Sequence, residues 1–164
     1  MPFANALSLA KRTFAYTNHT ILPEALECWS EEYVKKILPD IADIMVRIGV
    51  YAMREYQTLG CSKQQASEMA IYSGGRFYMA NLAVYVAKTV NGVAALHTEI
   101  LKNNLFATAH RFYPNKLQNK TNGITHRRWL ELCNKELSSL LDKTIGVNWR
   151  SDITDLGRLN GFTD

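Results

Sequence analysis

Apolar residues recur at helical spacing in three stretches of the chain. Between Pro39 and Gly60 they lie three and four residues apart, which predicts the longest helix. The stripe that begins at Val93 predicts a second helix, ending near Asn103. A third helix is predicted between Asn134 as its cap and Gly146 as its stop. The apolar positions in the three stretches are Ile41, Ile44, Met45, Ile48 and Tyr51; Val93, Leu96, Ile100 and Leu101; and Leu137, Leu140, Leu141 and Ile145.

Residues typical of helix caps and turns mark the ends of four shorter predicted helices. Pro23 suits the first turn of a short helix over residues 23–29. Ser30 is predicted to cap a helix that begins at the next residue and ends near position 39. Ser62, with glutamine three residues later, forms a capping-box pattern for a helix running to about position 72, where two glycines follow. Thr125 or Asn122 is predicted to cap a helix through positions 129 and 132.

Three further stretches favour extended structure. Residues 13–20 mix β-branched and aromatic side chains, and residues 115–123 contain a short extended piece within a connection. Residues 77–90 carry little charge and predict a buried strand, although their alanine content leaves a helix open. Residues 151–164 have no strong pattern. The fold class is therefore mostly α with a few short strands, which by itself names no activity.

Composition and charge argue against nucleic-acid and membrane partners. The chain has 164 residues, 47% of them hydrophobic, which is enough for the core of a soluble domain. The net charge of +4 is interspersed, with Arg127-Arg128 as the one arginine pair, so no basic strip indicates nucleic-acid binding. No basic leader with a long apolar run and no stretch of about 18 apolar residues is found, so we expect a cytoplasmic protein without a membrane partner.

The cysteines indicate neither a disulfide framework nor a metal site. They are three in number, far apart, and without a CxxC or Cys/His spacing. We therefore expect reduced, partly buried thiols and no metal. The three positions are Cys28, Cys61 and Cys133.

Three segments place small polar side chains, a glycine or a histidine among apolar elements. They are residues 17–26, 90–101 and 119–129. Such segments suit a sugar site, because hydroxyl groups need donors and acceptors of fixed direction. By spacing alone, however, His19 is more often a buried hydrogen-bonded histidine, Asn122-Gly123 an ordinary turn pair, and Trp129 an ordinary core aromatic.

The same segments resemble the glycogen, starch and maltodextrin phosphorylases. Sequences of that family contain AYTNHTxLPEALE, VNGVAxxHxEIL and NxTNGITxRRWL, and the matches here are residues 15–27, 90–101 and 119–130. The resemblance implies a segment of an α/β two-domain glycosyltransferase. It places residues 1–122 at the end of the N-terminal domain and residues 123–164 at the start of the C-terminal, cofactor-bearing domain.

The resemblance also implies roles for single residues. His19 matches the histidine that contacts the glucosyl unit around its 6-hydroxyl, and Asn122 matches the asparagine that hydrogen-bonds the same sugar. Val90 and Asn91 match residues close to that sugar, and Trp129 matches an aromatic residue near the cofactor. His126 stands where many relatives have proline. His97, on an apolar stripe, is predicted to be a core or interface histidine.

The family reaction is phosphorolysis of terminal α-1,4-linked glucose to glucose 1-phosphate with retention, assisted by pyridoxal phosphate. The family's cofactor-lysine run, EASGTGNMK, and its basic phosphate segment, KRxHEYKRQ, do not occur in this sequence. We therefore expect one wall of a glucosyl site, inactive alone and without the cofactor's attachment lysine. The implied partners are the remainder of the phosphorylase chain, α-1,4-glucan, phosphate and a second subunit.

Two other interpretations remain open at this stage. The chain could be a non-catalytic fragment that binds carbohydrate or a protein partner. It could also be a stand-alone helical interaction protein, which would bury its apolar helix faces against one another instead of exposing large apolar patches.

Overall fold

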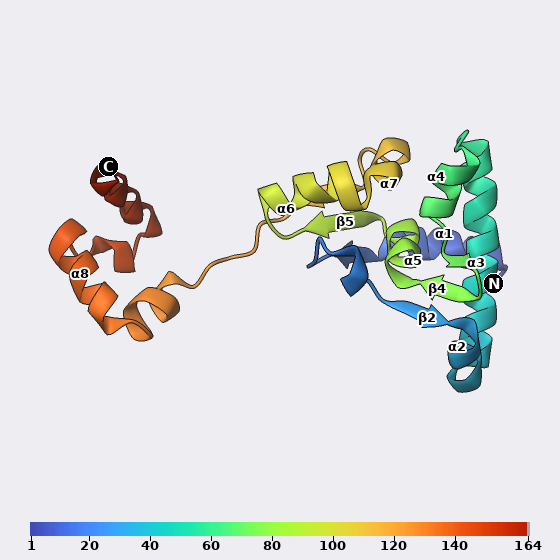
Figure 1. Ribbon diagram of the computed structural model, residues 1–164, viewed down its shortest axis with the longest axis horizontal. Helices are drawn as coiled ribbons and strands as arrows, with labels where there is room; N and C mark the ends of the chain where they lie inside the picture. The colour runs from blue at the N-terminus through green and yellow to red at the C-terminus, as the bar shows by residue number, and fades with distance from the viewer. Residues whose placement is uncertain (164) are drawn as a thin grey trace. The chain divides into compact units, whose positions relative to one another are not determined.

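A computed structural model of the chain describes residues 1–163. It divides into two compact units, unit 1 (Met1–Asn122) and unit 2 (Gly123–Asp164) (Figure 1). The elements confirm the predicted class, since most are helical and the strands are short. That the units belong to two different domains of a longer enzyme stays a prediction.

Unit 1 contains two small sheets surrounded by helices. In the first, β5 lies between β1 and β6 and all three strands are parallel; in the second, β4 lies between β2 and β3 and the strands are antiparallel. The strands are β1 (Ala15–Thr17), β2 (Cys28–Ser30), β3 (Tyr72–Ser73), β4 (Arg76–Tyr78), β5 (Thr89–Gly92) and β6 (Leu117–Asn119). The helices are α1 (Phe3–Thr13), η1 (Pro23–Ala25), α2 (Glu31–Ile37), α3 (Pro39–Thr58), α4 (Lys63–Glu68), α5 (Met79–Val86), α6 (Ala95–Ile100), η2 (Leu101–Leu105) and α7 (Ala107–Phe112).

The long helix and two predicted caps are confirmed. α3 begins at Pro39, whose ring suits the first helical turn, and it ends two residues before Gly60. Ser30 caps α2 by accepting a hydrogen bond from the N–H of Tyr33 (3.2 Å). Ser62 and its partner glutamine form a complete capping box at α4, although this helix ends at Glu68, earlier than predicted.

The strand predicted over residues 77–90 is wrong. The stretch contains the end of β4, the helix α5 and the start of β5. An apolar run that is buried on several sides has no polar positions to reveal its period, so pattern alone does not separate helix from strand. The two glycines before this stretch form the turn of the β3–β4 hairpin, with φ of +56° at Gly74 and +72° at Gly75.

Other boundaries also differ from the predictions. Only η1 is helical within residues 23–29, because Cys28 and Trp29 pair with β4 instead. Residues Phe3–Thr13 form α1, a helix that the sequence pattern did not predict. Neither Thr125 nor Asn122 caps the next helix, which begins after His126 without a side-chain cap bond. The cysteines are free, but Cys133 is exposed, so the expected partial burial is wrong there.

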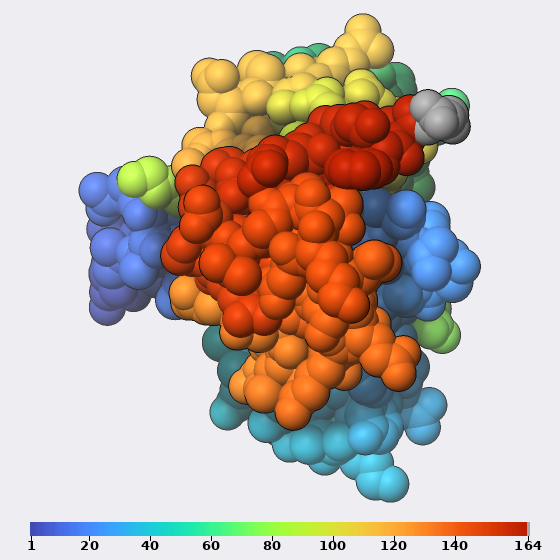
Figure 2. Space-filling model, turned by 90° about the vertical axis from the view of Figure 1, so that its left-hand side faces the viewer, coloured from blue at the N-terminus to red at the C-terminus, as the bar shows by residue number. Residues whose placement is uncertain are grey.

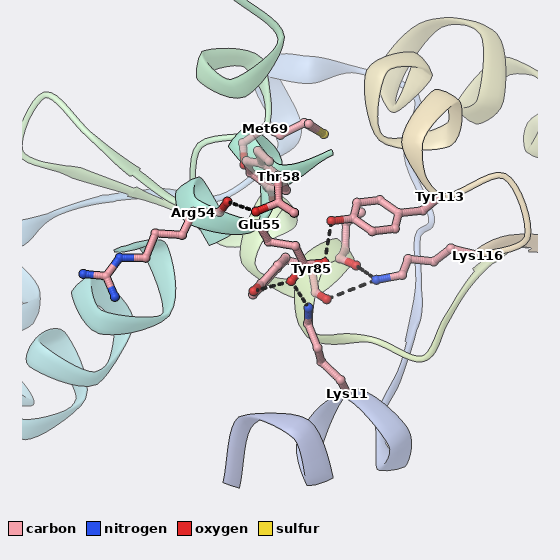
Figure 3. A network of polar contacts seen from close by, with 10 residues as sticks. Lys11, Arg54, Glu55, Thr58, Met69, Tyr85, Tyr113 and Lys116 are labelled. Carbon is pink, nitrogen blue, oxygen red and sulfur yellow. Dashed lines mark hydrogen bonds and ion pairs between the residues drawn. The ribbon is translucent and has the colours of Figure 1, made fainter. Parts of the chain in front are cut away.

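A partly buried carboxylate in unit 1 joins several elements. Glu55 of α3 accepts hydrogen bonds from Lys11 Nζ of α1 (2.7 Å), from Tyr85 Oη of α5 (2.9 Å) and from Tyr113 Oη after α7 (2.8 Å) (Figure 3). Nearby, Lys116 Nζ donates to the carbonyls of Val84 (2.9 Å) and Tyr85 (3.1 Å). This network satisfies polar groups that would otherwise be costly to bury.

Unit 2 has a small core of its own. Leu141, Ile145 and the fully buried Trp149 form its centre, and Trp149 Nε1 donates to Asp142 (3.1 Å). Figure 2 shows one face of this unit in orange and red. Asn134 caps its main helix and Gly146 ends it, as predicted. Its helical elements are η3 (Arg127–Leu132), α8 (Lys135–Ile145), η4 (Asn148–Arg150) and η5 (Ile153–Phe162).

Candidate functional site

The parallel sheet of unit 1 brings the three polar segments of the sequence together. Residues 17–26 and residues 119–129 begin on either side of residues 90–101. Because β1, β5 and β6 are parallel, their carboxyl ends meet at one edge of the sheet. The residues that follow these ends include His19 after β1 and Asn122 after β6, with Asn91 near the end of β5 between them. Ligands of open α/β sheets commonly bind at this edge, outside the carboxyl ends of the strands.

Backbone hydrogen bonds fix both flanking segments to the end of β5. The N–H of Asn18 donates to the carbonyl of Asn91 (3.0 Å). On the other side, the N–H of Asn122 donates to the carbonyl of Val93 (2.8 Å). The two candidate sugar contacts therefore stand on backbone that is anchored to the same central strand.

The turn that carries His19 is held by a buried asparagine. Asn18 is 1% exposed; its Oδ1 accepts from the N–H of Thr20 (3.0 Å) and its Nδ2 donates to Tyr16 Oη (3.2 Å). Such an Asx turn fixes the backbone on both sides of residue 19. His19 itself is exposed, and so is Asn122, so both side chains are accessible.

The turn after β5 is tied to the segment that leads to Asn122. Thr98, which is 1% exposed, donates from its hydroxyl to Asn119 Oδ1 (3.0 Å). Asn119 Nδ2 donates in turn to Thr121 Oγ1 (3.1 Å). Gly92 is packed directly against Thr98, so closely that a Cβ at position 92 would lie 2.2 Å from Thr98 Oγ1.

Other candidates lie in different surroundings. The side chain of Val90 is fully buried in the sheet. That Val90 lies close to a sugar stays a prediction. Asn91 is half-buried, and its Oδ1 is without a hydrogen-bond partner among residues 1–163. His97 lies in α6, where its Nδ1 accepts from the N–H of Val93 (3.1 Å) and so orients the ring.

Trp129 and His126 lie in unit 2. Trp129 is 67% exposed in η3, and its position near a cofactor stays a prediction. His126 has φ of −60°, a value that proline also adopts, so histidine here requires no change of backbone. Its Nε2 lies 3.3 Å from the carbonyl of Arg150, and its ring lies near that of Trp149.

The sequence motifs indicate His19, Asn91 and Asn122 as candidate contacts, but they do not single out the residues that position them. Asn18, Thr98 and Asn119 occur within the three segments. The side chain of Asn18 bonds only near neighbours in the sequence, whereas the bond between Thr98 and Asn119 joins two of the segments. The polar residue directly before His19 was the only local signal, because a buried asparagine in a turn usually bonds its own backbone.

A pyridoxal group requires an amine that is partly unprotonated near neutral pH. Among residues 1–163, Lys116 is the lysine whose pKa is lowered, to about 8, mainly by burial. However, Lys116 directly precedes β6, at the amino end of the strand, and its amino group bonds two carbonyls there. Lys116, the lysine with the lowered pKa, therefore lies away from the carboxyl ends of the parallel strands.

Residues 1–163 contain neither a candidate membrane span nor a candidate metal cluster. Among residues 1–163, no helix is long and apolar enough to cross a membrane. In the same residues, no cluster of three or more His, Cys, Asp or Glu side chains could hold a metal ion.

The chain is mostly helical and has a small parallel sheet with polar residues at the carboxyl ends of its strands. These features define an α/β protein with a candidate ligand-binding site at those strand ends. Comparison with known proteins makes this class specific. The sequence model of the carbohydrate phosphorylase family matches residues 1–164, and the chain belongs to this family.

Its relatives include phosphorylases from animals, bacteria and plants. The chain is 40% identical to the liver form of glycogen phosphorylase from Bos taurus over 99% of its length. It is 41% identical to maltodextrin phosphorylase from Streptococcus pneumoniae serotype 4 and 43% identical to the H isozyme of α-glucan phosphorylase from Triticum aestivum, each over 97% of its length. In each case it covers 20% of the relative, so the chain spans about a fifth of the length of these proteins.

Proposed function

We propose that the chain forms one wall of the glucosyl-binding site of an α-glucan phosphorylase. The observation that carries this proposal is the anchoring of His19 and Asn122 on opposite sides of the end of β5. An imidazole and an amide supply donors and acceptors in fixed directions, which is what sugar hydroxyls require. In this proposal His19 contacts the 6-hydroxyl of a glucosyl unit, and Asn122 hydrogen-bonds the same unit.

The complete enzyme would cleave terminal α-1,4-linked glucose with phosphate, giving glucose 1-phosphate with retention. Val90 and Asn91 would lie close to the sugar, and Trp129 close to the pyridoxal phosphate. The attachment lysine and the phosphate contacts would come from the remainder of the polypeptide. The isolated chain is accordingly proposed to be inactive.

The partners follow from the same proposal. They are the remainder of the phosphorylase chain, an α-1,4-glucan, phosphate and a second subunit. A cytoplasmic location is part of the proposal as well; one relative, from Arabidopsis thaliana, is named a cytosolic α-glucan phosphorylase.

A chimeric enzyme tests the proposed sugar contacts. In it, this chain replaces the matching fifth of the Streptococcus pneumoniae maltodextrin phosphorylase, and phosphorolysis of maltodextrin is measured. We expect His19→Ala and Asn122→Ala each to lower kcat/KM about fivefold or more, because loss of one substrate hydrogen bond costs about 1 kcal/mol or more. Asn5→Ala, on the exposed side of α1, is the matched control and should have no effect.

Unchanged kcat/KM in both variants would contradict the proposed contacts. Sugar binding by the isolated chain, measured by NMR titration with maltose, gives a second readout. Binding of maltose that depends on His19, together with an inactive chimera, would instead favour the non-catalytic carbohydrate-binding interpretation.

A further inference from the structure

His97 takes the place of a side-chain cap at the start of α6. This helix begins after Ala94, which makes no side-chain cap bond. His97, in the first turn, reaches back instead, and its Nδ1 accepts a hydrogen bond from the N–H of Val93 (3.1 Å). A glutamate or glutamine in the first turn reaches back in a similar way in a capping box. The imidazole therefore fixes the peptide group that joins the end of β5 to Val93.

The bond at Nδ1 also assigns the proton of the ring. A backbone N–H only donates, so Nδ1 must accept and carries no proton. The one proton of a neutral imidazole then lies on Nε2. In His97 this atom is buried and has no hydrogen-bond partner among residues 1–163. Because an unpaired buried donor is costly, the bond to Val93, and not a partner of Nε2, holds the ring in this orientation.

The residue that His97 restrains also holds Asn122. The carbonyl of Val93 accepts a hydrogen bond from the N–H of Asn122 (2.8 Å), in the segment that follows β6. The backbone has only two soft dihedral angles per residue, so a bond that fixes the N–H of Val93 restrains the direction of its carbonyl. His97 is thus linked to Asn122 through Val93.

The other side of β5 is held by different groups. The N–H of Asn18 donates to the carbonyl of Asn91 (3.0 Å), and the side chain of Asn18 fixes the turn that carries His19. The bond between His97 and Val93 lies on the opposite side, toward Asn122. The imidazole is therefore expected to act on one candidate sugar contact and not on the other.

We propose that His97, as a neutral imidazole with its proton on Nε2, is the positioning residue for Asn122 in the glucosyl site. In this role it contacts no substrate and directs the backbone from which the side chain of Asn122 extends. The link between the two residues depends on the structure alone, whereas its effect on catalysis rests on the proposed function.

Magnetic resonance of the isolated chain tests the link without activity. Proton–nitrogen correlation spectra of the histidine rings should show the proton of His97 on Nε2. His97→Leu should speed exchange of the Asn122 amide about tenfold or more, because the restraint on its acceptor is lost. His97→Asn should restore slow exchange, since an asparagine oxygen can take the place of Nδ1. The amide of Asn18 is the internal reference, and Leu96→Ala, at a 74% exposed position of α6, is the matched control.

A double-mutant cycle in the chimera with the Streptococcus pneumoniae maltodextrin phosphorylase tests the effect on catalysis. His97→Leu should lower kcat/KM about twofold or more, but by no more than Asn122→Ala does. Combined with Asn122→Ala it should lower kcat/KM no further, because the contact through which it acts is already lost. Combined with His19→Ala, the two losses should multiply. A residue that only stabilised the fold would multiply both losses.

The proposal is overturned if the ring proton lies on Nδ1, or if His97→Leu leaves exchange of the Asn122 amide unchanged. Equal acceleration at Asn18 and Asn122 would also overturn it, because that result indicates general destabilisation. In the chimera, losses that multiply with Asn122→Ala would show that His97 acts by another route. An inactive chimera with the expected exchange rates would contradict the proposed function and leave the positioning of Asn122 in place.

Discussion

At the end of β5, one glycine sets how closely two elements of the candidate site can approach. The Cα of Thr98 would lie 2.9 Å from a Cβ at position 92, and backbone atoms cannot move away without shifting α6. The sequence contains this glycine within a family motif, but its neighbour Thr98 is known only from the fold. The motif therefore predicted a glycine at position 92, but only the fold shows that the close approach of Thr98 requires it.

Gly92→Ala is expected to destabilise unit 1 by about 1–3 kcal/mol, because overpacking a tight contact forces the backbone to shift. Urea unfolding followed by circular dichroism measures the change. Gly123→Ala is the matched control, since nothing lies within 4 Å of a Cβ there and its φ is not in the left-handed region. The explanation fails if the two substitutions have the same effect.

Helices with regular spacing and a clear cap were predictable, whereas elements set by distant contacts were not. Ser62 and Asn134 begin α4 and α8 through bonds to residues three positions later, which is local information. In contrast, Trp29 is in a strand because it pairs with Phe77, far along the chain. The helix α5 was missed because an apolar run shows no period.

Asn134→Ala should destabilise unit 2 by about 1 kcal/mol, because it removes the acceptor for the N–H of Leu137 (3.0 Å) at the start of α8. Thermal unfolding monitored by the fluorescence of the buried Trp149 reports on this unit, after Trp29 and Trp129 are changed to phenylalanine. Asn160→Ala provides an exposed control. Equal midpoints for the two variants would argue against the cap.

At the scale of the whole molecule, ionisable groups from several helices meet around Glu55. Burial raises the pKa of this carboxyl, but hydrogen bonds from Lys11 and Tyr113 outweigh burial, so the pKa lies below its ordinary value. Burial lowers the pKa of Lys116 to about 8 and raises the pKa of Tyr85 well above its ordinary range. These shifts predict how stability depends on pH.

Stability should fall as pH drops below about 4.5, because the unfolded chain then binds the proton that folded Glu55 takes up only at lower pH. Glu55→Gln should remove this part of the acid dependence of the urea midpoint. Glu99→Gln, at an exposed ion pair, is the control and should leave the dependence in place.

Between about pH 8 and pH 10.5 stability should rise, because folded Lys116 has lost its proton while the unfolded lysine still holds one. Lys116→Met should flatten this rise in urea midpoint, and Lys88→Met, at an exposed position, should not. A rise that persists in Lys116→Met would show that another group causes it.

The isolated chain is expected to produce no glucose 1-phosphate from maltodextrin and phosphate after addition of pyridoxal phosphate. The reason is that the family's cofactor-lysine run, EASGTGNMK, does not occur in this sequence. Absorbance in the Schiff-base region is recorded in parallel. Stoichiometric cofactor uptake with turnover would mean that the chemistry needs fewer residues than proposed.

The sequence by itself determined the family resemblance, the long helix and the capped helix starts, because these depend on residues close together in the chain. It also named His19, Asn91 and Asn122 as candidates. Only the tertiary structure decided that they follow neighbouring parallel strands, and that Thr98 bonds Asn119 beside them. Strand order and buried hydrogen bonds join residues far apart in sequence, and no local pattern encodes which distant partners meet.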